Sequence, residues 1–434
     1  MEIRFAHMAD THLGAFRDPT LRSLNLEAFL KALDMVRKEG CEFLVIAGDM
    51  FDTSLPDMDV VERAADGLRR LTDAGVRIYV LYGSHDRSLT EKGIVDVLES
   101  AGLFKNVGVL DLDDERDHPP LTVDGPTGTV LAAVGGRQLT LERALFETAD
   151  WSPLADAVVD APLAIFGYHG PVEGMMPEGL GKLETIDMGR LPPGFHYYAL
   201  GHVHHHAIEV VHEGGVAVYP SPTFGASFTD LADGREKGLV IVDVDDDGRC
   251  HPRHVPIDIA PMKVLDLDVA GRSGEDAAGR LAALVEEVEP KDAIVLLRVH
   301  GTLSSGRPSD LSIRKARTTL QERGATAIFV NRRGLRKPMA VELEGAVGIT
   351  GLDRRQIERH AFEEALDSYE TPVRWLSGKE GVSLAEELLT VAKEGQGDLG
   401  VATYAERAKA RAMEVLALHE RPGPPTEEEG GEDR

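Results

Sequence analysis

The chain has 434 residues, of which 42% are hydrophobic, so it is long enough to bury more than one core. Its net charge of −27 opposes non-specific binding to nucleic acid, and its two cysteines exclude a disulfide framework and favour a reducing cytosol. No stretch approaches the ~20 apolar residues of a membrane span, and a strand beginning at residue 3 leaves no room for a signal peptide, so we expect a cytoplasmic protein with no membrane partner.

The first hundred residues alternate between predicted strands and helices. Apolar, β-rich runs predict the strands, and apolar residues at helical spacing predict the helices between them. The strands are expected at residues 3–9, 42–47 and 78–81, and the helices at 26–36, 57–74 and 93–101. This order predicts an α/β fold with layered β-sheets flanked by helices.

Each of these strands ends on residues of the kind that bind metals. Asp10 and His12 follow the first strand, and their i, i+2 spacing places both side chains on one face of an extended chain. The second strand is followed by Asp49 and Asp52, and the third by Ser84, His85 and Asp86. Since ligands of open α/β sheets bind outside the carboxyl ends of the strands, these side chains are candidates for chemistry.

Later strands repeat this pattern. Strands are predicted at residues 107–112, 129–134, 162–168 and 197–200. His169 follows the third of these, and His202 and His204 follow the fourth, although a chance local excess of histidine is the alternative. Asp and His without thiolates suit manganese, iron or zinc. Two such ions bridged by a carboxylate, for which Asp49 is the candidate through its two oxygens, are the usual apparatus for phosphoester hydrolysis.

These motifs resemble those of the calcineurin-like metallophosphoesterase superfamily. The matching segments, in order and spacing, are Asp10-x-His12, Gly48-Asp49-x-x-Asp52, Gly83-Ser84-His85-Asp86, His169 and Gly201-His202-x-His204. Within it, the chain is similar to the SbcD-type DNA double-strand-break repair nucleases, the relatives of the eukaryotic meiotic-recombination nuclease. The segments FAHMADTHLG, VIAGDMFDTS and YPSPTFGASFTD…EKGLVIVDVD carry this narrower resemblance, which covers about the first 245 residues.

The resemblance implies a site with two manganese ions. Asp10, His12, Asp49 and His204 would hold one ion, and Asp49, His169, His202 and Ser84 would hold the other. His85 would be the catalytic histidine that contacts phosphate, and Asp52 would orient it. Relatives usually have asparagine where Ser84 stands. Because a hydroxyl is a short and neutral ligand, we expect the second ion to bind more weakly.

The resemblance also implies a function. Relatives cut duplex DNA as 3′→5′ exonucleases and nick single strands as endonucleases, working as homodimers with an SMC-like coiled-coil ATPase. Helices at 57–74 and 93–104 are the candidate dimer interface, although their apolar Ile94, Val95, Leu98 and Phe104 could equally be core. A small-molecule phosphoesterase and a nuclease-weak scaffold subunit are the alternatives.

The nuclease-like domain is expected to span residues 1–257, ending with strands at 238–244 and 251–257. A small α/β module is expected at residues 258–345. Its strands are predicted at 263–269, 293–299 and 325–330, and its helices at 275–288 and 309–323. The resemblance implies that this module caps the active site and contacts DNA.

Residues 313–338 are basic in an otherwise acidic chain. They carry eight Arg and Lys residues against Glu322 alone, a net charge of +7, so the other 408 residues carry −34. Candidate DNA-contacting residues are Arg314, Lys315, Arg317, Arg332, Arg333, Arg336 and Lys337. The alternative is a solvated helix face and turn.

The remaining residues, 346–420, are predicted to be helical, with helices at 353–370, 382–393 and 401–419. Leu384, Leu388 and Leu389 form an apolar stripe with no later strand to cover it, which makes them candidates for partner binding. In the resembled family this region binds the ATPase, whereas a self-packed helical tail is the alternative. The Pro/Gly/Glu-rich residues 421–434 are expected to be a disordered acidic tail.

Overall fold

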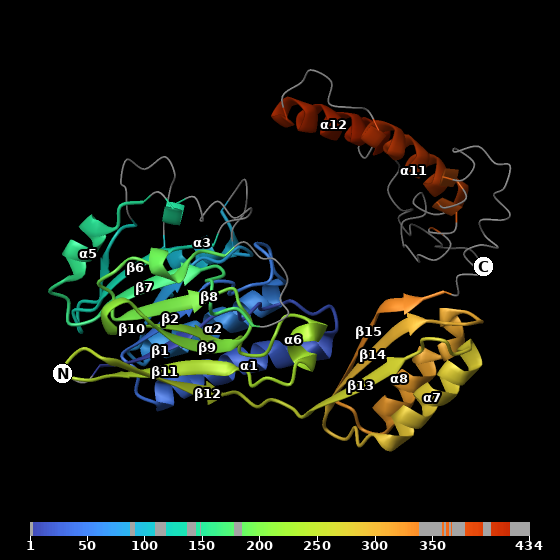
Figure 1. Cartoon of the computed structure of the whole chain (residues 1–434), viewed down its shortest axis with the longest axis horizontal. Helices are drawn as coiled ribbons and strands as arrows, with labels where there is room; N and C mark the ends of the chain where they lie inside the picture. Colours follow the sequence, from blue (N-terminus) through green and yellow to red (C-terminus); the bar gives the residue numbers. More distant parts are fainter. Residues whose placement is uncertain are drawn as a thin grey trace, which may run out of the picture. The chain divides into compact units, whose positions relative to one another are not determined.

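The computed structural model describes most of the chain up to residue 337 and two helices beyond it. The described residues are 3–86, 92–108, 119–136, 145–147, 149–177, 185–337, 358–359, 362–363, 366, 378–393 and 401–416. The chain divides into two compact units, Met1–Arg336 and Lys337–Arg434 (Figure 1). None of the helices within these described stretches is both long enough and apolar enough to pass through a membrane.

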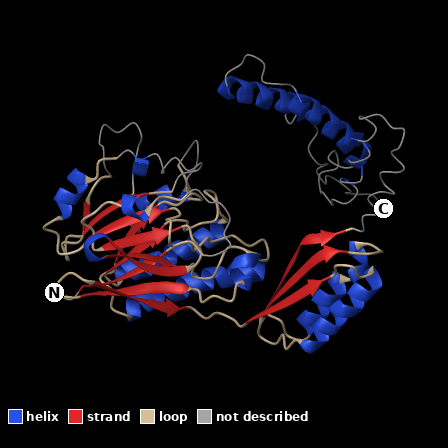
Figure 2. Ribbon diagram, in the orientation of Figure 1, coloured by secondary structure: helices blue, strands red, loops and turns tan. Residues whose placement is uncertain are grey.

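Two six-stranded sheets form the body of the first unit (Figure 2). The first sheet has the order β12-β11-β1-β2-β3-β4 and the second has the order β5-β6-β7-β8-β10-β9. The first sheet comprises β1 (Ile3–Met8), β2 (Phe43–Ala47), β3 (Arg77–Leu81), β4 (Lys105–Asn106), β11 (Gly238–Val244) and β12 (Cys250–Pro256). The second comprises β5 (Thr122–Val123), β6 (Val130–Val134), β7 (Ala164–His169), β8 (Tyr197–Gly201), β9 (His206–Val211) and β10 (Gly215–Pro220). Strands β1 to β3 run parallel, as do β6 to β8.

The sheets pack face to face, and helices cover their outer faces. Apolar side chains of both sheets, including Phe5 and Ile165, share one buried cluster between them. Helices α1 (Pro19–Lys38), α2 (Met58–Asp73) and α3 (Ile94–Ser100) pack on the first sheet, and α5 (Ser152–Val158) packs on the second. The predicted α/β class with layered sheets is therefore confirmed. We call this body, residues 3–256, the two-sheet domain.

The α/β module, residues 262–336, follows in the same unit. Its parallel sheet has the order β13-β14-β15. The module comprises β13 (Met262–Asp268), α7 (Gly274–Glu287), β14 (Ile294–Thr302), α8 (Ile313–Glu322) and β15 (Ala327–Arg336). One face of the sheet packs on α7 and α8. Ile294 and Leu296, on the other face, join the core cluster of the two-sheet domain, so the module docks through buried apolar contacts.

Three sequence predictions need correction. The helix predicted at 309–323 is two pieces, a 3-10 turn at Pro308–Leu311 and α8, because Ser312 between them has a left-handed φ of +51°. The strand predicted at 325–330 continues to Arg336, so Arg332, Arg333 and Arg336 lie on a strand rather than a turn. In place of the strand at 107–112, Lys105–Asn106 pairs with β3, and residues 109–112 lie outside the described part.

The first unit also contains elements that the sequence did not predict. Strands β9 and β10 form a hairpin at one edge of the second sheet, and α5 and α6 (Phe228–Ala232) are short helices. In the candidate dimer helix α3, Val95 and Leu98 are buried, as is Phe104 after it, while Ile94 packs against the core. These four residues are therefore core.

The second unit contains α11 (Gly378–Lys393) and α12 (Val401–Leu416), which contact each other. Leu384 is buried, and Leu388 and Leu389 are half-buried, so the expected apolar stripe is not fully uncovered. The predicted helix at 353–370 lies mostly outside the described residues, as do the domain boundary at 345 and the tail at 421–434.

Candidate metal centre

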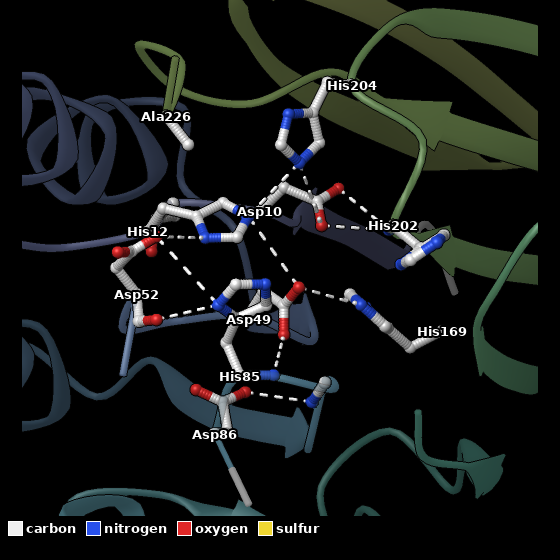
Figure 3. A network of polar contacts seen from close by, with 12 residues as sticks. Asp10, His12, Asp49, Asp52, His85, Asp86, His169, His202, His204 and Ala226 are labelled. Atoms are coloured by element: carbon white, nitrogen blue, oxygen red, sulfur yellow. Dashed lines mark hydrogen bonds and ion pairs between the residues drawn. The ribbon is translucent and has the colours of Figure 1, made fainter. Parts of the chain in front are cut away.

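Side chains from both sheets converge at the carboxyl ends of the parallel strands (Figure 3). Three groups of possible metal ligands are found here, and within each group the ligand atoms lie within 4.8 Å of one another. The groups are Asp10, His12 and His204; Asp49, His169 and His202; and His12, Asp52 and His85. The first sheet supplies Asp10, His12, Asp49, Asp52 and His85, and the second supplies His169, His202 and His204. Eight of the predicted site residues therefore meet at one place.

Asp49 belongs to the second group and also lies close to the first. Its Oδ2 is 3.7 Å from His12 Nε2 and 3.1 Å from His169 Nε2. Its Oδ1 accepts a hydrogen bond of 2.8 Å from the backbone N of His85. Asp49 therefore lies close to ligand atoms of both groups, and its bridging of two ions stays a prediction.

Hydrogen bonds fix the orientation of three histidine rings. His12 Nδ1 donates to Asp52 Oδ1 at 3.2 Å, and His169 Nδ1 donates to the Ala47 carbonyl at 2.8 Å. His204 Nδ1 donates to Asp230 Oδ2 at 3.0 Å. With Nδ1 as the donor, the neutral form of each ring has its lone pair on Nε2, which is the pattern of a metal-ligating histidine with an orienting partner.

The Nε2 atoms of His12 and His204 face each other at 3.1 Å. Neither nitrogen carries a proton when Nδ1 donates, so two lone pairs point at the same space. A divalent cation between such atoms would satisfy both, and the nearby buried carboxylates of Asp10 and Asp49 would balance its charge. The donor set therefore fits a metal ion.

Asp52 acts on two histidines in different ways. Its carboxylate lies 3.2 Å from His12 Nδ1 but 4.0 Å from His85 Nδ1. His85 Nδ1 instead donates to the backbone carbonyl of Asp52 at 2.7 Å. The main chain of Asp52 therefore contacts His85 while its side chain contacts His12, and the role of Asp52 in orienting His85 stays a prediction.

The buried carboxylates and imidazoles of the site shift one another's pKa values. Burial lowers the pKa of His169, but the adjacent Asp49 carboxylate outweighs it and raises the pKa to about 10. Burial raises the pKa of Asp49, but His169 and His12 bring it well below its usual range. Burial, and then the charge of His169, lower the pKa of His202 to about 4. A cation bound here would compete with protons, since ligand imidazoles must be neutral.

The backbone of the site is strained. Asp10, His12, Asp49 and His202 have φ values of +55°, +40°, +51° and +90°, which are uncommon for residues other than glycine. Such strain persists where surrounding structure enforces it, and it clusters at functional sites. Gly48 precedes Asp49 with φ +87°, and a Cβ there would lie 2.1 Å from His169 Nδ1, so only glycine allows the two sheets to approach here.

The family model described as calcineurin-like phosphoesterase matches residues 3–206. These residues belong to that family. The matched range contains β1 to β8, all seven predicted metal ligands and His85, so the five strand ends converge within the matched phosphoesterase domain.

Relatives of this phosphoesterase include repair nucleases. The chain is 27% identical over 373 residues to the DNA double-strand break repair protein Mre11 of Methanopyrus kandleri, covering 82% of this chain and 77% of that protein. It is 24% identical over 245 residues to the protein of the same name from Methanococcus maripaludis, covering 54% and 61%. It is 26% identical over 268 residues to a subunit of the nuclease SbcCD of Bacillus subtilis, covering 56% and 66%.

Ser84 lies in the turn that carries His85. Asp86 holds this turn, since its carboxylate accepts hydrogen bonds from the backbone N of Gly83 at 2.9 Å and of Phe51 at 3.2 Å. Burial, with the Asp49 charge, raises the pKa of Asp86 to about 6. Ser84 is half-buried beside His85, and its hydroxyl as a ligand of the second ion stays a prediction.

The sequence did not reveal the role of Asp230. Burial raises the pKa of Asp230, but its hydrogen bond with His204 brings the pKa well below its usual range. Ser227 caps α6 by accepting from Asp230 N, so the Ser-x-x-Asp pattern signals a helix start. That pattern cannot reveal a contact with a histidine 26 residues earlier in the chain.

Proposed function

We propose that this chain is a metal-dependent DNA nuclease that processes double-strand breaks. It would act as a 3′→5′ exonuclease on duplex DNA and as an endonuclease on single strands. The main support is the pair of ligand groups beside His85, with Asp49 Oδ2 of one group 3.7 Å from His12 Nε2 of the other. The relatives named as double-strand break repair protein Mre11 and as part of the nuclease SbcCD support DNA as the substrate.

We propose two manganese ions as the cofactors. Asp10, His12, Asp49 and His204 would hold one ion, and Asp49, His169, His202 and Ser84 would hold the other. Nitrogen and oxygen donors without thiolate suit manganese. When bound, the ions supply Lewis-acid activation of water and of the phosphodiester.

His85 is the residue best placed to act on the departing group. Its side chain is 46% exposed, so a substrate can reach it, unlike His12 and His169. Its Nδ1 donates to the Asp52 carbonyl, which leaves Nε2 for the substrate. A protonated ring can donate from Nε2 to a phosphate oxygen and then to the leaving oxygen.

Part of the basic segment gathers around a cavity, which supports DNA rather than a small phosphoester as the substrate. Arg314, Arg317 and Arg332 line a cavity of about 490 Å³ between α8 and β15, and we call it the basic pocket. All three arginines are exposed. Arginines at such a cavity can contact phosphates of a DNA backbone. Arg323, by contrast, donates to the Val285 and Val288 carbonyls at the end of α7 and has a structural role.

Parallel assays on a DNA duplex with 3′ ends and on a nucleotide monoester, both with manganese, test this proposal. We expect cleavage of the duplex, and none by a His85→Ala variant. Hydrolysis of the monoester without any cleavage of DNA would instead establish the small-molecule phosphoesterase. DNA binding without hydrolysis of either substrate would establish the scaffold subunit.

We propose that the chain forms a homodimer through α2 and α3. Leu55, three residues before α2, is 84% exposed, Met58 at the start of α2 is 65% exposed, and Val97 of α3 is 56% exposed. Ile94 N donates to the Ser54 carbonyl, which brings α3 beside Leu55. Sedimentation of a Leu55→Asp, Val97→Asp variant should show monomers, whereas Val123→Asp, at an exposed position of β5, should stay dimeric. A dimeric double variant would contradict this interface.

We propose that the second unit, Lys337–Arg434, binds an SMC-like coiled-coil ATPase. The similarity to a subunit of the nuclease SbcCD supports this proposal. Leu388 and Leu389 of α11 are partly accessible, and Met413 of α12 is 46% exposed, so they provide apolar contact area. Leu384 is buried and would support the helix rather than touch the partner. Deletion of residues 372–434 should abolish co-purification with that ATPase, and retained binding would refute the assignment.

A further inference from the structure

The short helix α6 joins the two-sheet domain to the α/β module. It contacts all three strands of the module. Phe228 of α6 packs against Phe329 of β15, with ring centroids 5.4 Å apart, and Arg298 of β14 lies 5.6 Å from the centre of the Phe228 ring. Phe228 is buried. The position of α6 therefore depends on how the module is docked.

The same helix also contacts His204, one of the candidate metal ligands, through Asp230. Asp230 lies two residues after Phe228, and its Oδ2 accepts hydrogen bonds from His204 Nδ1 at 3.0 Å and from Ala226 N at 2.9 Å. Gly225 has φ +120°, and a Cβ there would lie 3.0 Å from Asp230 Cβ, so this loop packs tightly against Asp230.

His204 depends on this hydrogen bond more than the other oriented histidines do. Its side chain is 25% exposed, whereas those of His12 and His169 are 4% and 0% exposed. Close packing restrains the two buried rings, but a quarter-exposed ring can rotate unless a hydrogen bond holds it. His204 Nε2 would then lose its place 3.1 Å from His12 Nε2.

We propose that Asp230 positions His204 for metal binding and that α6 couples this contact to the docking of the α/β module. The inference rests on the metal centre of the proposed function. It adds that the docking of the α/β module changes the affinity of this centre for its ion. Loosening the contact of Phe228 with Phe329 frees α6, and His204 then binds its ion less tightly. By linkage, ion binding favours the docked module.

Calorimetric titration of the metal-free full chain with Mn²⁺ tests the contact of Asp230 with His204 without relying on nuclease activity. Asp230→Asn should weaken one of the two Mn²⁺ binding events by ~10–100-fold, the usual cost of losing an orienting partner. Asp230→Glu keeps the carboxylate and should recover part of the affinity. Asp233→Asn is the matched control, because Asp233 follows the same helix but pairs with Lys237 at 3.0 Å.

The contact of Phe228 with Phe329 is tested by Phe329→Ala. This variant should weaken the same Mn²⁺ binding event by a smaller factor than Asp230→Asn does. Val330→Ala is its control, because Val330 is the next residue of β15 but packs within the core of the module. If α6 couples the two contacts, the Asp230→Asn, Phe329→Ala double variant should bind Mn²⁺ no more weakly than Asp230→Asn alone.

Wild-type Mn²⁺ affinity in either Asp230→Asn or Phe329→Ala overturns the inference, as does full additivity in the double variant. Thermal unfolding with a chelator shows whether each variant is folded. If Asp230→Asn does not fold, Asp230→Glu and Phe329→Ala carry the test, and wild-type affinity in both overturns it. A wild-type chain that binds no Mn²⁺ would overturn the proposed metal centre as well.

Discussion

The metal centre and the basic pocket differ in how firmly their side chains are held. At the centre, Asp10 and Asp49 are buried and His12 is fixed by Asp52 through a hydrogen bond. At the basic pocket, Arg314 and Arg332 are exposed to solvent. Chemistry at a phosphorus atom needs fixed geometry, whereas attraction of a polyanion needs only charge of the right sign. Substitutions should therefore act on rate at the centre and on salt-dependent affinity at the pocket.

The largest effect is expected for His85→Ala. The ring is held by the Asp52 carbonyl in reach of a substrate, and general acid catalysis typically contributes ~100–10,000-fold. DNA cleavage should fall by about that factor, with unchanged duplex binding measured by fluorescence anisotropy. His251→Ala removes a histidine that is 62% exposed and pairs with Asp245, and it should cleave as the wild type does. Normal cleavage by His85→Ala would show that the centre does not use this residue.

Ser84→Asn should strengthen binding of the second ion at the metal centre. An amide oxygen on a longer stem is a better ligand than a hydroxyl, so the manganese concentration for half-maximal nuclease activity should fall by ~10-fold or more. Ser100→Asn, at the end of α3, is the control substitution. If the manganese titrations of wild type and Ser84→Asn overlie, then residue 84 does not limit the second ion.

Charge reversal on β15 should change affinity but not metal binding. With Arg332, Arg333 and Arg336 replaced by Glu, duplex affinity at low salt should fall by about tenfold or more. The slope of log affinity against log salt should decrease by roughly one for each phosphate that the protein no longer neutralises. Arg280→Glu, at an exposed position of α7 outside the basic segment, should have a much smaller effect. An unchanged affinity would mean that this segment is only a solvated surface.

The smallest effect concerns stability. His7 of β1 is fully buried beside Tyr197, and burial lowers its pKa to about 3, whereas an unfolded chain keeps a value near 6.5. Between these values only the unfolded state takes up the proton, so the free energy of unfolding falls as pH falls, by about 1.4 kcal/mol per pH unit. Above pH 6.5 this contribution is absent.

Urea unfolding of His7→Gln with a chelator, from pH 7 to pH 5, measures this contribution. The variant should lose stability less steeply than the wild type by about 1.4 kcal/mol per pH unit. The exposed His251 provides the control through His251→Gln, which should keep the wild-type slope. Equal slopes for His7→Gln and wild type would mean that acid destabilisation comes from other groups.

The sequence by itself determined the pieces of the centre. An apolar β-rich run followed within a few residues by Asp or His is a local signal, because strand formation and the direction of the next side chains depend on adjacent residues. It correctly indicated the ends of β1, β2, β3, β7 and β8 and the side chains that converge there. The α/β class followed from the same alternation of strands and helices.

Tertiary structure decided how those pieces meet. Pairing into two sheets places His169 against Asp49, 120 residues apart, and this approach brings Asp49 between candidate ligands of the two sheets. The contact of Asp230 with His204 and the gathering of Arg314 with Arg332 depend on packing between elements that no local pattern relates. Propensity acts over a few residues, whereas these contacts arise only when separate elements pack together, so they appear only in the folded chain.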